Sequence, residues 1–182
     1  MKTDGMTEVL PLSKKQKYAC NIVMGAMFVA AGVILILAGT GVIDASVRKI
    51  AAPTVLFAFG TAVLVSAIIA KNALSMWIAG VIITCGLPSL ISAVTAAGYG
   101  QLYPLYIGAP AIGCVFAIFY SEAKMPQIKG FLFFGVLAAI FALQSSGTCG
   151  WGLTAGLLAA FGGVCIIIYA VCAYFNREKE NA

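Results

Sequence analysis

The chain has 182 residues, of which 62% are hydrophobic and 9% charged, with a mean hydropathy of +1.04 and a formal net charge of +5. Soluble domains carry about 25% charged residues, so this chain lacks the polar side chains needed to cover a water-soluble fold, and lipid must be its solvent. The basic excess is small and confined to tails and connectors, which argues against nucleic-acid binding and for a role in membrane topology.

The first 17 residues are polar and basic. They differ from a signal peptide, because the apolar run after them is too long for a signal sequence and has no small-residue cleavage site closely behind it. We therefore predict a basic cytoplasmic tail over 1–17, a membrane domain over 18–175, and a second cytoplasmic tail over 176–182.

Apolar runs long enough to cross a bilayer, which takes about 20 residues in a helix, follow one another along the chain. They lack the period-two alternation of barrel strands, and a backbone in lipid must satisfy its own hydrogen bonds, so we expect helices. The runs are 18–42, 50–70, 73–95, 102–121, 128–145 and 151–175. The sequence thus predicts an all-α, polytopic membrane protein with six transmembrane helices.

These helices are predicted to form three antiparallel hairpin repeats, over about 18–70, 73–121 and 128–175. Each repeat has a glycine in both helices and a short polar turn between them, and short turns make consecutive helices antiparallel neighbours. Helices in lipid associate by close backbone approach, which small residues permit. The glycines expected to serve helix packing are Gly32, Gly60, Gly86, Gly113, Gly135, Gly152, Gly156 and Gly163.

The basic residues predict the orientation of the chain. An even number of spans places both tails on one side of the membrane. Of the 11 lysines and arginines, only Arg48 and Lys49 lie on the opposite side. Because positive residues are retained on the cytoplasmic side, we expect a multi-pass protein of the inner (plasma) membrane with both termini in the cytoplasm.

The predicted spans offer little catalytic chemistry. The chain has no histidine. Its acidic residues all lie in tails or connectors, and they are Asp4, Glu8, Asp44, Glu122, Glu178 and Glu180. Proton relays use ionisable groups inside the membrane, metal sites need clustered ligands, and catalytic nucleophiles need a neighbouring base. We therefore expect no enzyme activity, no metal and no cofactor.

The six cysteines show no metal or redox spacing. All but one fall in apolar runs, where cysteine acts as a small hydrophobic residue. Cys149 lies in the turn of the third hairpin, and two alternatives stay open for it: a buried loop residue or a free thiol.

The middle hairpin contains two internal prolines, Pro88 and Pro110. Each removes a backbone hydrogen bond and kinks its helix, and Ser89 or Ser92 could satisfy the freed carbonyls. Broken helices near the midplane mark substrate sites in many transporters, whereas a static kink repaired by its neighbours is the alternative. With Gln144 from a polar cluster at the outer end, these residues form the candidate ligand or kink region.

The first repeat has a glycine-marked apolar helix with Gly32, an external turn at Gly41, a second helix started by Pro53, and Gly60. Proline fits a helix start well, and we expect Pro104 to occupy the same position in the second repeat. This pattern resembles the transmembrane module of LiaI/LiaF-like bacterial envelope-stress proteins. The chain is also similar to the six-helix HdeD-like acid-resistance membrane proteins. Neither resemblance supplies a catalytic motif.

Two functions remain as expectations. The first is a non-enzymatic bacterial integral membrane protein that acts in envelope stress or through helix–helix contacts in a membrane complex. The alternative is a small transporter or substrate-binding membrane subunit for a neutral or weakly polar solute. The expected partners are the lipid bilayer and a membrane protein or a second copy of the chain. A water-accessible cavity at Ser89 or Gln144 would favour transport, and a filled interior with small residues at the helix crossings would favour contacts.

Overall fold

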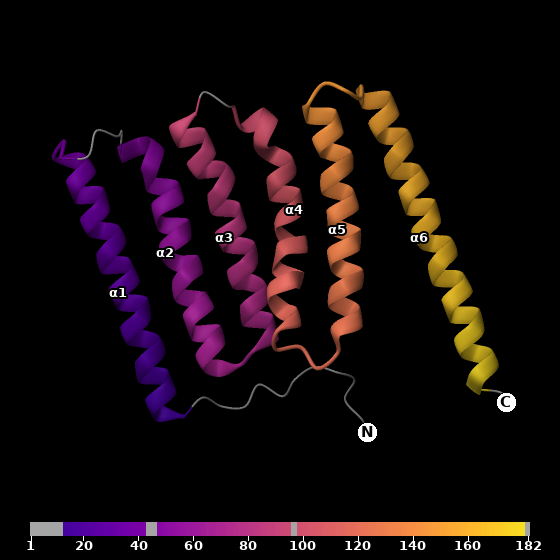
Figure 1. The fold of residues 1–182 in the computed structure, drawn as a ribbon, viewed down its shortest axis with the longest axis horizontal. Helices are drawn as coiled ribbons and strands as arrows, with labels where there is room; N and C mark the ends of the chain where they lie inside the picture. The colour runs from indigo at the N-terminus through magenta and orange to yellow at the C-terminus, as the bar shows by residue number, and fades with distance from the viewer. Residues whose placement is uncertain (1–12, 43–46, 96–97, 181–182) are drawn as a thin grey trace. The chain divides into compact units, whose positions relative to one another are not determined.

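The computed structural model describes residues 13–42, 47–95 and 98–180, and every regular element within these ranges is an α-helix (Figure 1). The helices are α1 (Lys14–Gly39), α2 (Val47–Ala70), α3 (Ala73–Val94), α4 (Tyr99–Ile118), α5 (Lys124–Ser145) and α6 (Trp151–Glu180). All six are long and apolar enough to cross a membrane. The predicted all-α fold with six membrane-spanning helices is therefore confirmed.

The helix starts differ from the prediction by up to one turn. Helix α1 begins at Lys14 because Ser13 and Gln16 form a capping box, in which the Ser13 hydroxyl accepts from the Gln16 backbone N–H and the Gln16 amide oxygen accepts from the Ser13 N–H. Helices α2 and α4 also begin earlier than expected. Pro53 and Pro104 therefore lie inside their helices, and the prediction that they start them was wrong.

The chain divides into two compact units, residues 1–138 and 139–182. In the first unit, α1 packs against α2, α2 against α3, and α3 against α4. Helix α5 continues the series within this unit, because Gly130 lies close to the Cys114 sulfur and Gly108 lies close to Ala138. This arrangement is compatible with three hairpins, and the threefold repeat stays a prediction.

The core of the first unit forms where α2, α3 and α4 cross at glycines. A Cβ atom at Gly113 would lie 2.8 Å from the backbone oxygen of Trp77, and one at Gly80 would lie 3.0 Å from the Gly113 Cα. A Cβ atom at Gly60 would lie 2.6 Å from the Ile83 side chain. Alanines fill the same crossings; those with no exposed surface are Ala62, Ala67, Ala79, Ala109 and Ala117. Small residues thus let these backbones approach closely, as lipid-embedded helices require.

The predicted packing glycines fall into two groups. Gly60, Gly86 and Gly113 lie at close helix contacts, with the Phe57 ring against Gly86. At the others, a Cβ atom would meet no atom within 4 Å in the described chain; these are Gly32, Gly135, Gly152, Gly156 and Gly163. Of the predicted packing glycines, those in the first group lie at close contacts between the described helices, as do Gly80, Gly108 and Gly130.

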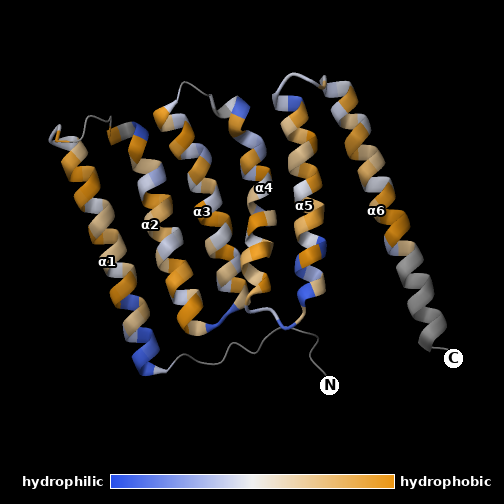
Figure 2. Cartoon of the chain, in the orientation of Figure 1, coloured by the Kyte–Doolittle hydropathy of each residue, from blue (hydrophilic) through white to orange (hydrophobic). Residues whose placement is uncertain are grey.

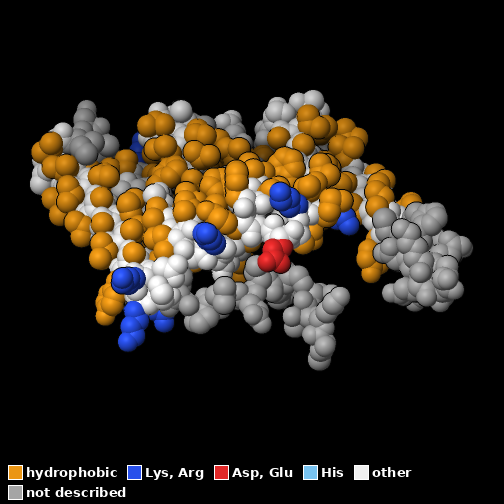
Figure 3. Space-filling view, turned by 60° about the horizontal axis from the view of Figure 1, so that its bottom comes forward, with side chains coloured by type: hydrophobic (Ala, Val, Ile, Leu, Met, Phe, Trp, Pro, Cys, Tyr) orange, Lys and Arg blue, Asp and Glu red, His pale blue; other side chains and the backbone are white. Residues whose placement is uncertain are grey.

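Polar residues lie mainly at the helix ends, and the helix bodies are apolar (Figure 2). In the first unit, lysine side chains gather on the face that carries the start of α1 and the turn between α2 and α3 (Figure 3). The lysines at these helix ends are Lys14, Lys15, Lys17, Lys71, Lys124 and Lys129. Lys71, directly after α2, has a left-handed backbone with φ of 50°. Glu122 is exposed in the connector before α5, and Asp44 lies outside the described residues.

The close crossing of α3 and α4 makes a direct prediction. Replacing Gly113→Ala would push a methyl group into the Trp77 carbonyl, so we expect the free energy of unfolding to fall by roughly 1–3 kcal/mol, as for other overpacked cores. The measurement is thermal unfolding of the purified chain in detergent. Gly135→Ala is the matched control, because a Cβ atom there meets nothing within 4 Å and alanine favours a helix by about 1 kcal/mol over glycine. Equal melting temperatures for the two variants would contradict the close crossing.

Candidate functional site

The kinked part of α3 contacts α4 through a pair of hydroxyl groups. The Ser89 hydroxyl lies 3.1 Å from the Tyr106 hydroxyl and 3.5 Å from the Cys85 carbonyl oxygen. Ser89 is only 5% exposed, and the neighbouring Pro88 is fully buried. Either hydroxyl can donate in the bond between Ser89 and Tyr106. Pro88 and Ser89 therefore lie at a closed, hydrogen-bonded contact between two helices.

Proline chemistry explains why polar groups gather here. Pro88 has no N–H for the Thr84 carbonyl, and Pro110 has none for the Tyr106 carbonyl. Thr84 is itself buried and donates its hydroxyl to the Gly80 carbonyl at 2.7 Å. Hydroxyl groups that find backbone or side-chain partners are tolerated in membrane helices, so this polarity is largely satisfied within α3 and α4.

The remaining predicted site residues lie outside the contact between Ser89 and Tyr106. Ser92 and Pro110 are half-buried in α3 and α4. Gln144 is half-buried near the end of α5, in the second compact unit. Ser89 is the predicted site residue that bonds across α3 and α4, to Tyr106. The sequence analysis did not single out Tyr106; its position four residues before Pro110 is the signal that could have indicated an internal role.

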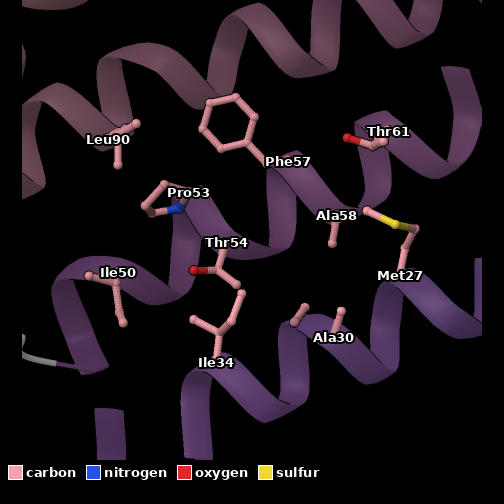
Figure 4. Close-up of a pocket in the computed structure, with 11 residues that line it drawn as sticks. Met27, Ala30, Ile34, Ile50, Pro53, Thr54, Phe57, Ala58, Thr61 and Leu90 are labelled. Atoms are coloured by element: carbon pink, nitrogen blue, oxygen red, sulfur yellow. The ribbon is translucent and has the colours of Figure 1, made fainter. Parts of the chain in front are cut away.

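A groove runs between α1 and α2, and the sequence analysis did not find it. Its volume is about 380 Å³. Figure 4 shows side chains of α1 and α2 facing each other across it, with Leu90 of α3 beyond them. The lining residues are Met27, Ala30, Ala31, Ile34, Ile50, Pro53, Thr54, Phe57, Ala58, Thr61 and Leu90. Only the two threonines bring polar side-chain atoms, and no lining residue is charged.

Local packing explains why this space is not filled. The lining positions recur every three or four residues, so they occupy one face of each helix. Ala30, Ala31 and Ala58 are too short to meet across the gap. The Phe57 ring lies toward α3 and packs on Gly86, where an added Cβ would be 3.2 Å from the ring. With the Phe57 ring packed on α3, an apolar groove stays open between α1 and α2. Phe59, the other phenylalanine of α2, instead lies against α1, with its ring centroid 6.3 Å from that of Phe28.

The described residues show no cluster of metal ligands. Within 13–42, 47–95 and 98–180, no three histidine, cysteine, aspartate or glutamate side chains gather as metal ligands would. Cys149 is a free cysteine buried in the turn between α5 and α6. The groove can hold an apolar ligand by shape. The absence of enzyme activity and of cofactors stays a prediction.

No family model, no curated protein and no solved structure matches this chain. The resemblances to LiaI/LiaF-like and HdeD-like membrane proteins therefore continue to rest on the hairpin pattern in the sequence alone.

The hydroxyl pair can be tested with a double-mutant cycle on Ser89→Ala and Tyr106→Phe. Hydrogen bonds between membrane helices couple by about 0.6 kcal/mol on average, so we expect a coupling free energy of that size and only a small loss of stability in either single variant. Thermal or denaturant unfolding in detergent measures it. Strictly additive effects would show that the two hydroxyls do not bond.

Proposed function

We propose that this protein is a non-enzymatic integral membrane protein that acts through helix–helix contacts with a membrane partner or a second copy of the chain. The carrying observation is the closed crossing of α2, α3 and α4, where Gly60, Gly80 and Gly113 bring backbones together. This interior is filled by small residues. The groove in α1 and α2 is not lined by Ser89 or Gln144, the residues that a transport pathway was expected to use.

The outer helix of the first unit supports this proposal. In the most apolar window of α1 only 11% of residues are buried, against 33% for α3. Its exposed side chains include Ile22, Val29 and Ile36, each more than 60% exposed. Such a face contacts lipid and is also available to another helix. The resemblance to envelope-stress modules suggests the bacterial envelope as the setting of that contact.

Transport of a neutral or weakly polar solute is the second candidate. The observation that favours it is the pairing of a buried serine with a tyrosine beside Pro88, because transporters place polar groups at interrupted helices. The two functions make different demands on Ser89. A transporter needs its hydroxyl for the solute, whereas a contact protein uses it only to join α3 and α4.

Complementation of a deletion strain distinguishes these functions. We expect the deletion to lower survival under detergent or acid stress, and we expect Ser89→Ala and Gln144→Ala to restore it as well as the wild type does. Gly113→Ala should fail in proportion to its lost abundance, since it disrupts the helix crossing. Survival and membrane abundance are measured together. If Ser89→Ala or Gln144→Ala is abundant in the membrane but fails to restore survival, and also loses uptake of a solute, transport is favoured and the contact proposal is wrong.

We also propose that both termini lie in the cytoplasm. The support is the lysine-rich face of the first unit (Figure 3), because basic residues flanking spans are retained inside. That face carries Lys71 between α2 and α3 and Lys124 at the start of α5.

Cysteine labelling in intact cells tests this orientation. Native Cys149 is a poor probe because it is buried. Cysteines for labelling are therefore introduced at the exposed residues Thr148 and Glu122, in a Cys149→Ser background. With an impermeant maleimide, we expect Thr148→Cys to react in intact cells and Glu122→Cys to react only after permeabilisation. The reverse pattern would invert the topology, and reaction of both in intact cells would contradict the number of spans between them.

A further inference from the structure

We propose that the groove between α1 and α2 holds one acyl chain of an anionic bilayer phospholipid, whose headgroup phosphate lies at Lys49. This binding site is separate from the contact function proposed above and does not depend on it.

The length of the groove matches one leaflet. Its lining on α2 runs from Ile50 to Thr61, which at about 1.5 Å per residue is roughly 17 Å along the helix. The hydrocarbon core of a bilayer is about 30 Å thick, so one leaflet offers roughly 15 Å. The groove also begins close to the start of α2, at Val47. It therefore runs from the headgroup region toward the midplane, the path that an acyl chain follows.

The volume of the groove is too small for a helix. It is about 380 Å³, whereas a helix about 10 Å wide occupies roughly 1,300 Å³ over that length. A single extended hydrocarbon chain fits this space. A partner helix could cover the groove but could not enter it.

The lining of the groove suits a hydrocarbon. Met27, Ile34 and Leu90 present saturated side chains, and Phe57 presents its ring (Figure 4). Thr54 and Thr61 add hydroxyl groups without charge. A polar solute would leave its own hydrogen-bonding groups unsatisfied against such walls, at a cost of about 1–3 kcal/mol each. An acyl chain has no such groups.

The charge at the end of the groove selects the headgroup. Lys49 is exposed and directly precedes Ile50, the first lining residue of α2. Arg48 precedes it in the sequence. A cation at the membrane surface attracts an anionic headgroup, so Lys49 lies where the phosphate of a lipid seated in the groove would be.

Lipid retention by the full-length chain tests the proposal. Native mass spectrometry of the purified protein compares phosphatidylglycerol with phosphatidylcholine carrying the same acyl chains. We expect Lys49→Gln to lower phosphatidylglycerol retention about five-fold, the factor that one lysine contributes at an anionic surface. Lys71→Gln, an exposed lysine at the other end of α2, should leave retention unchanged. Equal retention of the two lipids by the wild type would overturn the headgroup assignment.

A filled groove tests the acyl-chain position separately. Ala30→Phe places a ring in the groove and should abolish preferential retention, whereas Ala52→Phe, at an exposed alanine of α2 outside the lining, should not. Unchanged retention in a folded Ala30→Phe variant would overturn the proposal.

A photoreactive diazirine on the acyl chain gives a second measurement on the wild type in phosphatidylcholine vesicles. We expect crosslinks to concentrate on the lining residues; crosslinks spread evenly over the exposed faces of α1 would overturn it.

Discussion

The fold depends on how closely two helix backbones can approach each other in lipid, where the hydrophobic effect does little to bring them together. Lipid is as apolar as leucine, so the hydrophobic effect that drives soluble cores gives little here. What remains is dispersion at short range, and it requires residues without side chains at the crossing. Gly80 faces Gly113, and Gly113 faces the Trp77 carbonyl. This contact fixes α3 against α4, and Gly60 fixes α2 against α3 in the same way.

Close crossing at some positions leaves space at others. Where α2 meets α3, the Phe57 ring is held against Gly86, so it forms one wall of the groove and does not fill it. The same helix therefore makes a tight contact on one face and a groove on the other. The positions of the hydroxyl groups are also explained by the local helix structure. Ser89 and Tyr106 bond to each other next to two prolines, where backbone carbonyls have lost their usual donors. The close helix crossings and the internal prolines thus account for both the packed core and the location of the candidate sites.

The sequence predicted the parts of this fold that depend on composition and left out those that depend on side-chain direction. The lengths of the apolar runs defined all six helices, because lipid allows few alternatives to a helix. The start of α1 was missed although Ser13 and Gln16 carry the capping-box spacing. The glycine pattern includes Gly60, Gly86 and Gly113, which lie at close contacts, and also Gly32 and Gly135, where an added Cβ meets nothing within 4 Å in the described chain. The groove could not be predicted, because nothing in the spacing of Pro53, Phe57 and Ala58 shows which way the ring turns.

The turn after α2 places a lysine where the local backbone favours glycine. A left-handed residue just past a helix end is usually glycine, since a side chain there costs roughly 1–3 kcal/mol. This chain has Lys71 at that position, with φ of 50°. It is the one basic residue between α2 and α3. On the topology proposed above, this backbone strain has a counterpart in biosynthesis, because a cation in a short connector favours retention of that connector in the cytoplasm during insertion.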